Sequence, residues 1–398
     1  MNSVKLLYDN EIFSWKSLLK SVGADSGCLP RVNLRDRIVV FQVDELSCPA
    51  ASILKQCMLT GGADALVHRE VITCKVAKSS AIVYGTPAAI KLGCNSLLGQ
   101  PFGLPVVSDT IKKTLTRQFG CSSVTVNNKK LVYSSSPLIM GILNVTPDSF
   151  SDGGKYSSLT TAVTEALMME KSGASIIDIG GESTRPGSQA VCAEEQIKRV
   201  IPVIAAIRDK SDIPISIDTT IPEVADKALE AGAGMINSID ALETDGMLEL
   251  AVSSSVPVVI MHKKGKPETM QQAPSYNNTV EEVGSYLSER AAVLFQAGIP
   301  YEKIIFDPGI GFGKRLADNI SLIQGLKQLK MQTGCRVLLG HSRKSFLGQI
   351  TGLTNAAERD SVTHIITVLA QSADIVRVHD VQGAVNALKV ADELRRLL

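Results

Sequence analysis

The sequence has little of what would mark a membrane protein, a nucleic-acid-binding protein or a secreted protein. Its 41 Lys and Arg residues nearly balance its 40 Asp and Glu residues, so no overall charge attracts it to nucleic acid or to an acidic membrane. No apolar run is long enough to span a bilayer, and the first residues include acidic ones that a signal peptide lacks. These absences predict a cytoplasmic protein with no nucleic-acid and no membrane partner.

Cysteine pairs are also missing. The 8 cysteines stand singly along the chain, and none has the C-x-x-C spacing of a structural zinc site. We therefore expect reduced, buried thiols rather than disulfides or a cysteine-based metal centre. A cysteine nucleophile is disfavoured, because no cysteine lies in a Gly-rich or His-bearing turn.

What the chain does contain is one unit repeated over its C-terminal part. Short runs rich in Val, Ile and Leu end in polar residues or glycine, and a stretch of helical periodicity follows each. Such runs occur at 138–146, 175–181, 215–218, 235–238, 256–262, 304–310, 336–343 and 375–381. Buried parallel strands alternating with helices in this number predict an α/β fold, a (β/α)8 TIM barrel, over residues 136–398. The competing fold, an open doubly wound sheet, would need a Gly-rich phosphate turn after its first strand.

Residues 1–135 follow a different pattern. Runs such as RIVVFQVDEL and SAIVYGT alternate with helical stretches, and CSSVTVNNKKLVYSSSP predicts a final hairpin or strand before a linker. We predict a small mixed α/β domain that ends at residue 135. Its sequence indicates no chemistry, since a lone histidine such as His68 beside a helical pattern is typical of a structural or surface residue.

The polar residues that end the strands carry the chemistry. In a TIM barrel they converge on one mouth, at the C-terminal ends of the strands. An acceptor-rich group follows the third, fourth and sixth strands and suits a flat ring with several N–H donors: Asp218, Asn237 and Asp307. A cationic group follows the last two strands, where such barrels often bind phosphate: Arg343, Lys344, Arg377 and His379. Together they predict a site for a nitrogenous ring that carries an anionic leaving group.

Asn144 ends the first strand and is the candidate metal ligand. Its neutral amide oxygen is a poor acid or base but a good ligand for Mg²⁺, which keeps water and phosphate oxygens in its other positions. We expect Mg²⁺ to arrive with the anionic leaving group. Several neighbours also have a purely structural interpretation: Asp178 and Glu182 would brace the second loop, and His262 and His341 would be core histidines.

Seven segments resemble, in order and spacing, the signature segments of the dihydropteroate synthase family. They are MGILNVTPDSFSDGG, DIGGESTRPGS, SIDT, VIMHKKGKPETMQ, DPGIGFGK, GHSRKSF and VRVHDV. The resemblance covers the whole predicted barrel. The chain as a whole is similar to long family members that have an extra N-terminal segment. It implies a transferase of folate biosynthesis that condenses 7,8-dihydropterin-6-ylmethyl diphosphate with 4-aminobenzoate and is a target of sulfonamides. Barrels of that family are often dimers, so the resemblance also points to a homodimer.

The resemblance assigns roles residue by residue. The implied catalytic residues are Asp218, Asp307, Lys344 and Arg377. The pterin ring would be held by Asp218, Asn237, Asp307 and Lys344, and Mg²⁺ and diphosphate by Asn144, Arg377 and His379. The 4-aminobenzoate site would be formed by Phe150, Thr184, Arg185 and Pro186, with Ser345 receiving the carboxylate at the start of a helix.

One position departs from the family pattern and keeps two alternatives open. Ser238 stands where the family usually has Asp, and this removes a carboxylate from the expected pocket wall. A catalytically silent pterin-binding protein is favoured if Ser238 is disabling. A pterin-dependent methyltransferase also binds a folate ring through strand-end Asp and Asn, but a methyl carrier needs no diphosphate clamp such as the SRKS and VRVHD segments imply.

Overall fold

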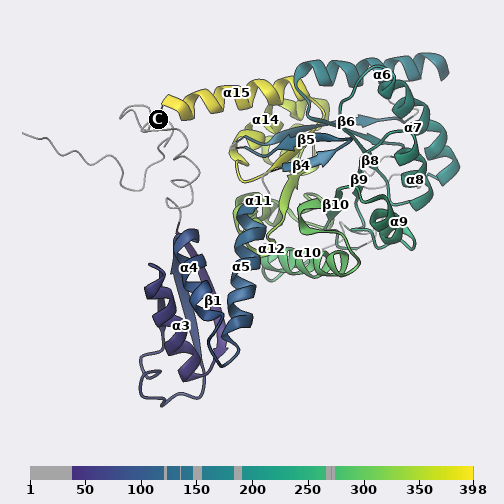
Figure 1. The fold of residues 1–398 in the computed structure, drawn as a ribbon. Helices are drawn as coiled ribbons and strands as arrows, with labels where there is room; N and C mark the ends of the chain where they lie inside the picture. Colours follow the sequence, from purple (N-terminus) through teal and green to yellow (C-terminus); the bar gives the residue numbers. More distant parts are fainter. Residues whose placement is uncertain are drawn as a thin grey trace, which may run out of the picture. The chain divides into compact units, whose positions relative to one another are not determined.

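A computed structural model of the chain describes residues 38–120, 123–134, 136–146, 155–182, 191–265, 270 and 274–397. These residues form two compact units, which divide between Gly120 and Cys121 (Figure 1). The sequence placed this boundary after residue 135. The difference arises because the hairpin at 123–132 belongs with the barrel, for the packing reason given below.

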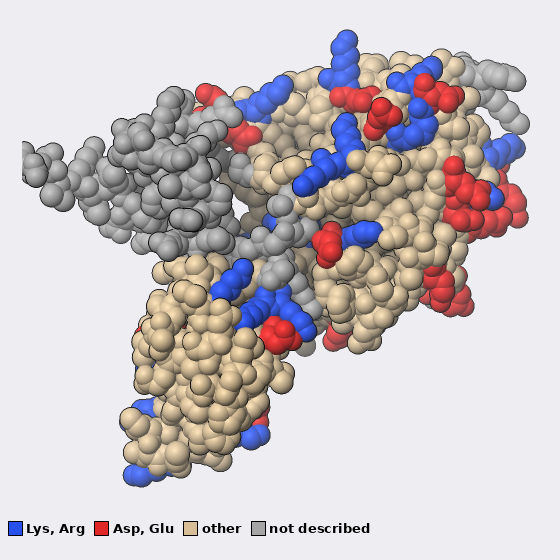
Figure 2. Space-filling model, in the orientation of Figure 1, with Lys and Arg blue, Asp and Glu red and all other residues tan. Residues whose placement is uncertain are grey.

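The N-terminal unit is a small α/β unit, as expected. An antiparallel sheet in the order β1-β3-β2 is built from β1 (Val39–Leu46), β2 (Asp64–Val67) and β3 (Ser79–Gly85). Three helices accompany it, α3 (Cys48–Thr60), α4 (Pro87–Leu97) and α5 (Leu104–Gly120). Its face in Figure 2 carries mostly uncharged side chains.

Local sequence sets where two of these helices begin. Ser47 and Thr86 precede α3 and α4, and each side-chain oxygen accepts a backbone N–H of the first turn. A proline follows each cap, where its missing N–H costs no helical hydrogen bond. The helices approach closely at Gly93, where a Cβ would lie 2.7 Å from the Sδ of Met58. These signals explain where α3 and α4 begin and how closely the two helices pack.

The second unit is the expected TIM barrel. Eight parallel strands close in the order β10-β11-β12-β13-β6-β7-β8-β9. They are β6 (Leu138–Asn144), β7 (Ile176–Gly180), β8 (Ile215–Asp218), β9 (Met235–Ser238), β10 (Val258–Met261), β11 (Ile304–Asp307), β12 (Arg336–Leu339) and β13 (Ile375–Val378). Each overlaps a run identified in the sequence, so the predicted fold is confirmed.

Amphipathic helices surround the strands (Figure 1). They are α6 (Lys155–Ser172), α7 (Ala193–Arg208), α8 (Pro222–Glu230), α9 (Met247–Ser254), α10 (Thr279–Gln296), α11 (Leu316–Gln324), α12 (Leu326–Thr333), α13 (Ser345–Thr351), α14 (Asp360–Leu369) and α15 (Val381–Leu397), with short 3₁₀ turns at Tyr301–Lys303 and Ala357–Arg359. Their inward faces and the outward faces of the strands share one large apolar core. Among the described helices, none is long and apolar enough to cross a membrane.

A hairpin closes the N-terminal end of the barrel. It consists of β4 (Ser123–Val126) and β5 (Lys129–Val132), and its turn residues Asn127 and Asn128 have φ values of 48° and 62°, which asparagine tolerates well. Apolar hairpin side chains pack against the first residues of the barrel strands in a separate cluster. The Asn127 side chain donates to the carbonyl of Gly232 and accepts from the N–H of Ile215. The hairpin is therefore a plug of the barrel.

Candidate active site

One cavity opens at the C-terminal ends of the strands, with a volume of about 290 Å³. Residues from six strand ends line it, together with the turns that follow β11 and β12. Among the lining residues are all the described site residues that the sequence singled out: Asn144, Asp218, Asn237, Asp307, Lys344, Ser345, Arg377 and His379. Strand register explains part of this, because Asp218 pairs with Asn237 and the parallel strands all end at the same level.

Arg377 crosses the mouth and joins two carboxylates. Its Nε donates to Asp178 at 2.5 Å and its Nη2 donates to Asp218 at 2.6 Å. Asp178 is fully buried and also accepts from Nδ2 of Asn237 at 3.0 Å. The sequence grouped carboxylates and cations apart, whereas the structure interleaves them. The reason is that buried charges need paired partners, and the long arginine side chain on β13 reaches β7 and β8 across the barrel.

Burial sets the protonation behaviour of the two pocket carboxylates. It raises the pKa of Asp218 to about 7, although the charge of Arg377 opposes this. It also raises the pKa of Asp307, against Lys344 and a hydrogen bond from the N–H of Gly309 at 2.7 Å. Gly340 stands beside Asp307, and a Cβ there would lie 3.1 Å from its Oδ2. A ligand that offers N–H donors would therefore stabilise the charged form of both carboxylates.

Lys344 enters the cavity from the turn after β12. Its Nζ donates to the carbonyl of Ile310 and lies 4.1 Å from the centre of the Phe312 ring. Burial lowers its pKa to about 8, while Asp307 opposes this shift. The ammonium group thus bridges the carboxylate end of the cavity and an aromatic wall. Phe312 lies inside the DPGIGFGK segment, but its role as a wall was missed because a single aromatic residue has no distinguishing spacing.

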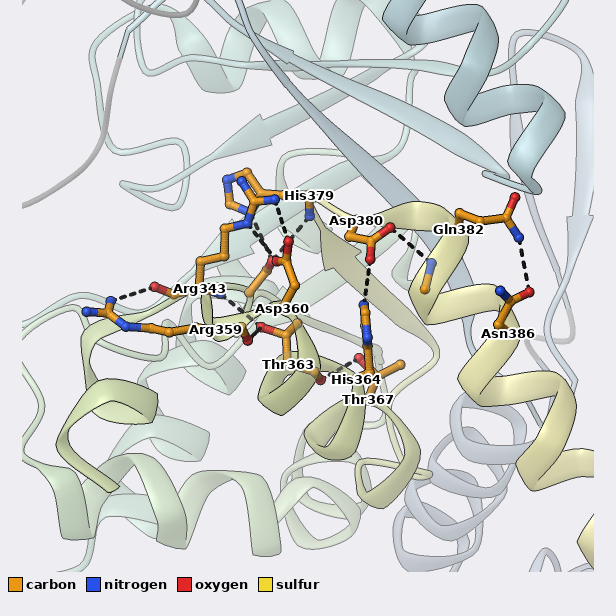
Figure 3. A network of polar contacts seen from close by, with 12 residues as sticks. Arg343, Arg359, Asp360, Thr363, His364, Thr367, His379, Asp380, Gln382 and Asn386 are labelled. Carbon is orange, nitrogen blue, oxygen red and sulfur yellow. Dashed lines mark hydrogen bonds and ion pairs between the residues drawn. The ribbon is translucent and has the colours of Figure 1, made fainter. Parts of the chain in front are cut away.

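His379 and the turn after β12 form a second polar cluster (Figure 3). The ring Nδ1 of His379 lies 2.9 Å from the hydroxyl of Ser342, which also accepts the backbone N–H of His379. Arg343, at φ 58°, donates two hydrogen bonds to Asp360. Arg359 donates to the carbonyl of Arg343 at 3.0 Å and also lines the cavity. Sequence analysis missed Arg359, because it follows a helix and not a strand.

Ser238 does not line the cavity in the part of the chain that the structure describes. It is fully buried, and its hydroxyl bonds to the carboxylate of Asp240, two residues further on. The neighbouring Ile239 is the residue that faces the cavity. The replacement of Asp by Ser at this position therefore leaves the lining acceptors Asp218 and Asp307 in place, and the structural reason for a silent protein is weakened.

His341 and Glu182 have the structural roles that the sequence suggested for them. His341 is fully buried and its Nε2 lies 3.0 Å from the hydroxyl of Thr367, as a core histidine does. Glu182 accepts from the side chain of Gln196 at 2.7 Å and braces the start of the second loop. The expected residues Phe150, Thr184, Arg185 and Pro186 lie outside the described residues.

The described residues contain no group of three or more His, Cys, Asp or Glu side chains arranged to hold a metal ion. Asn144, half-buried at the end of β6, contributes one neutral amide oxygen to the cavity wall. A metal held here by the protein alone would lack ligands. A metal that takes most of its ligands from a bound diphosphate fits this donor set.

Comparison with known proteins identifies the family. The model of the family "Pterin binding enzyme" matches residues 140–379. The dihydropteroate synthase of Escherichia coli strain K12 is 47% identical over 260 residues, which is 65% of this chain and 92% of that protein. The enzyme of Synechocystis is 46% identical over 261 residues, covering 65% of this chain and 90% of that protein.

Solved structures agree. The Xanthomonas albilineans dihydropteroate synthase with 4-aminobenzoic acid has a TM-score of 0.65 and 42% identity, covering 69% of this chain and 98% of that one. The Yersinia pestis enzyme in a sulfonamide complex has a TM-score of 0.65 and 39% identity, covering 69% and 99%. With the cavity residues in place, these similarities show that the chain belongs to the dihydropteroate synthases, a family of pterin-binding transferases.

Proposed function

We propose that the cavity at the barrel mouth joins 7,8-dihydropterin-6-ylmethyl diphosphate to 4-aminobenzoate and releases 7,8-dihydropteroate and diphosphate. The observation that carries this is the convergence of buried acceptors and cations on one cavity. A pterin ring presents N–H donors, a diphosphate presents anionic oxygens, and the lining residues supply a partner for each.

The acceptors and Lys344 hold the ring. Asp218 and Asp307 accept ring N–H groups, and Asn237 keeps its amide oxygen for the ring because its Nδ2 is already bound to Asp178. The carbon–oxygen bond between the pterin methylene and diphosphate breaks, and the electron pair leaves on oxygen. The two carboxylates stabilise the positive charge that remains on the methylene and ring.

Cations hold the other end of the substrate. Arg377 and His379 bind the departing diphosphate and stabilise its negative charge. Mg²⁺, when bound with the diphosphate, would neutralise part of that charge, and Asn144 would provide the protein ligand. The amine of 4-aminobenzoate attacks the methylene and then loses a proton, so no covalent enzyme intermediate is required.

The arylamine lies against Phe312 and Lys344. Ser345 receives its carboxylate through the hydroxyl group, with Arg359 as a nearby cation. Arg343 is neutralised by Asp360, whereas Arg359 is bonded to backbone carbonyls within the described part of the chain. The roles implied for Phe150, Thr184, Arg185 and Pro186 stay predictions.

A cytoplasmic homodimer is the second part of the proposal. Large apolar side chains are exposed on three consecutive barrel helices, α13, α14 and α15: Ile350, Ile365, Leu369, Val390 and Leu394. Exposed apolar side chains on successive helices would supply the apolar part of an interface between subunits. Size-exclusion chromatography with light scattering tests it, and a monomer at micromolar concentration contradicts it.

The activity test is direct. Purified protein is incubated with both substrates, and diphosphate release is measured with and without Mg²⁺. We expect release that depends on both substrates and on Mg²⁺. Pterin binding without release would favour a silent binding protein, and release without 4-aminobenzoate would contradict the proposed reaction.

A further inference from the structure

Lys314 is a buried amine that the proposed reaction does not use. It is 3% exposed and lies in the loop between β11 and α11. Its Nζ donates to the carbonyls of His262 and Phe312 at 3.2 and 3.1 Å, and it lies 3.0 Å from Nδ1 of His262. Within the described chain, all of these hydrogen-bond partners are neutral. A buried ammonium without a carboxylate at hydrogen-bond distance is costly, so burial favours the neutral amine unless a charge further away stabilises the ammonium.

His262 is built to accept from this lysine. Its ring lies 6.1 Å from the ring of Tyr276 and 5.1 Å from that of Tyr286, and burial together with the charge of Lys314 lowers its pKa to about 3. The imidazole is therefore neutral, and its Nδ1 is an acceptor when the proton is on the other nitrogen. Three acceptors then surround Nζ, which matches the three N–H donors of an ammonium group.

The two segments that Lys314 joins are packed backbone against backbone. A Cβ at Gly309 would lie 2.0 Å from the carbonyl oxygen of His262, and one at Gly313 would lie 2.1 Å from that of Lys264. Both glycines have positive φ, 69° and 64°. Tyr276 adds a hydrogen bond from its hydroxyl to the carbonyl of Gly313 at 2.9 Å. The loop after β11 thus packs closely against the end of β10, and the hydrogen bonds of Lys314 join the two segments.

That loop begins at Asp307, a carboxylate of the proposed pterin site. Burial raises the pKa of Asp307, and the charges of Lys344, Arg377 and Lys314 oppose this shift. Burial lowers the pKa of Lys314 to about 7, and the charge of Asp307 opposes that shift. The other charged or titratable groups that face these two residues are Asp218, His262, Lys264, Asp318, Lys344 and Arg377. Lys344 and Arg377 line the cavity, whereas Lys314 does not, so its charge acts on Asp307 from outside the cavity.

We infer that Lys314 is a positioning residue for the pterin end of the active site. Its hydrogen bonds hold the β11–α11 loop against the end of β10, and this fixes the position of Asp307. Its positive charge favours the ionised form of Asp307, which accepts hydrogen bonds from the pterin ring. This inference rests on the proposed function of the cavity. Lys314 itself touches no substrate.

The test measures binding of 6-hydroxymethyl-7,8-dihydropterin by calorimetry between about pH 5 and pH 8. Lys314→Met and Lys314→Gln remove the charge, and Lys314→Arg keeps it. We expect the neutral variants to bind about tenfold more weakly at neutral pH, which corresponds to about 1.4 kcal/mol. We also expect the pH below which their binding is lost to rise, because Asp307 then protonates more readily. The arginine variant keeps the charge, so the pH below which its binding is lost should stay at the wild-type value.

A matched control separates this role from simple loss of structure. Arg208 is a half-buried cation near the N-terminal ends of the strands, and it also donates to backbone carbonyls, those of Gly232 and Ser211 at 3.0 and 2.9 Å. Arg208→Gln is expected to lower thermal stability and leave pterin affinity and its pH dependence unchanged. Wild-type affinity in the neutral Lys314 variants overturns the inference, as does weaker binding without a pH shift. Failure of the wild-type protein to bind the pterin contradicts the proposed function instead.

Discussion

The two ends of the barrel are built from the same eight strands and differ completely in character. At the C-terminal end the strands finish in buried polar groups, and Arg377 ties Asp178 to Asp218. At the N-terminal end the inward residues are apolar, and a hairpin covers them. The first end places charges where water is scarce, which costs stability but enables chemistry. The second contributes stability and holds no candidate site among the described residues.

Replacing a carboxylate at the C-terminal end tests this contrast most strongly. Asp218→Ala removes an acceptor for the pterin ring and leaves Arg377 with one carboxylate fewer. We expect kcat/KM for the pterin substrate to fall about 100-fold to 1,000-fold, as when one member of a buried charged pair is lost. Steady-state diphosphate release measures this. Asp226→Ala, an exposed change on the following helix α8, is the control. A fall in kcat/KM of less than about tenfold in Asp218→Ala would contradict the assigned role.

A substitution at the N-terminal end should lower stability and leave substrate binding unchanged. Leu131 of the hairpin is 7% exposed, whereas its neighbour Val132 is 58% exposed. Leu131→Ala should lower the free energy of unfolding by about 2 to 4 kcal/mol, because it leaves a cavity under the strands. KM for both substrates should stay unchanged. Urea unfolding and kinetics measure the two effects, with Val132→Ala as the control. Equal destabilisation by both variants would mean that the hairpin is no plug.

The polar end should also make the stability of the protein depend on pH. The pKa of Asp218 is raised to about 7 in the folded chain, from 3.8. The folded state therefore binds this proton more tightly, so the group's contribution to stability is complete below about pH 4 and is lost as the pH rises through about 7. Asp218→Asn cannot titrate. The free energy of unfolding of this variant, relative to wild type, should thus increase as the pH rises from about 4 to about 7. If the free energies of the variant and the wild type change in parallel over this range, the raised pKa of Asp218 is refuted.

Strand patterns and motif spacing were enough to predict much of this molecule. All eight barrel strands and the convergence of Asn144, Asp218, Asn237 and Asp307 follow from the fact that parallel strands end at one edge. The roles of these residues in binding stay predictions. Arg359 and Lys314 escaped notice because neither ends a strand, and their significance arises from what packs against them.

Two further features depended on contacts between distant segments. The hairpin was expected in the N-terminal domain because it precedes a Ser-rich linker, yet Asn127 bonds to Gly232 and Ile215 of the barrel. Ser238 seemed to weaken the pocket, yet its side chain points to Asp240. Which face of a strand end meets the cavity depends on the closure of the whole barrel.

Local signals in the chain were enough to specify the fold class, the position of each strand and the set of polar residues at the mouth, because hydrophobic periodicity and turn residues act locally. Tertiary structure alone decided which of those charges pair, which are buried and how their pKa values shift. Arg377 reaches two carboxylates because barrel closure brings β13, β7 and β8 together in a medium of low polarity. Electrostatic interactions of that kind depend on distance and burial, and neither is encoded in the spacing of residues along the chain.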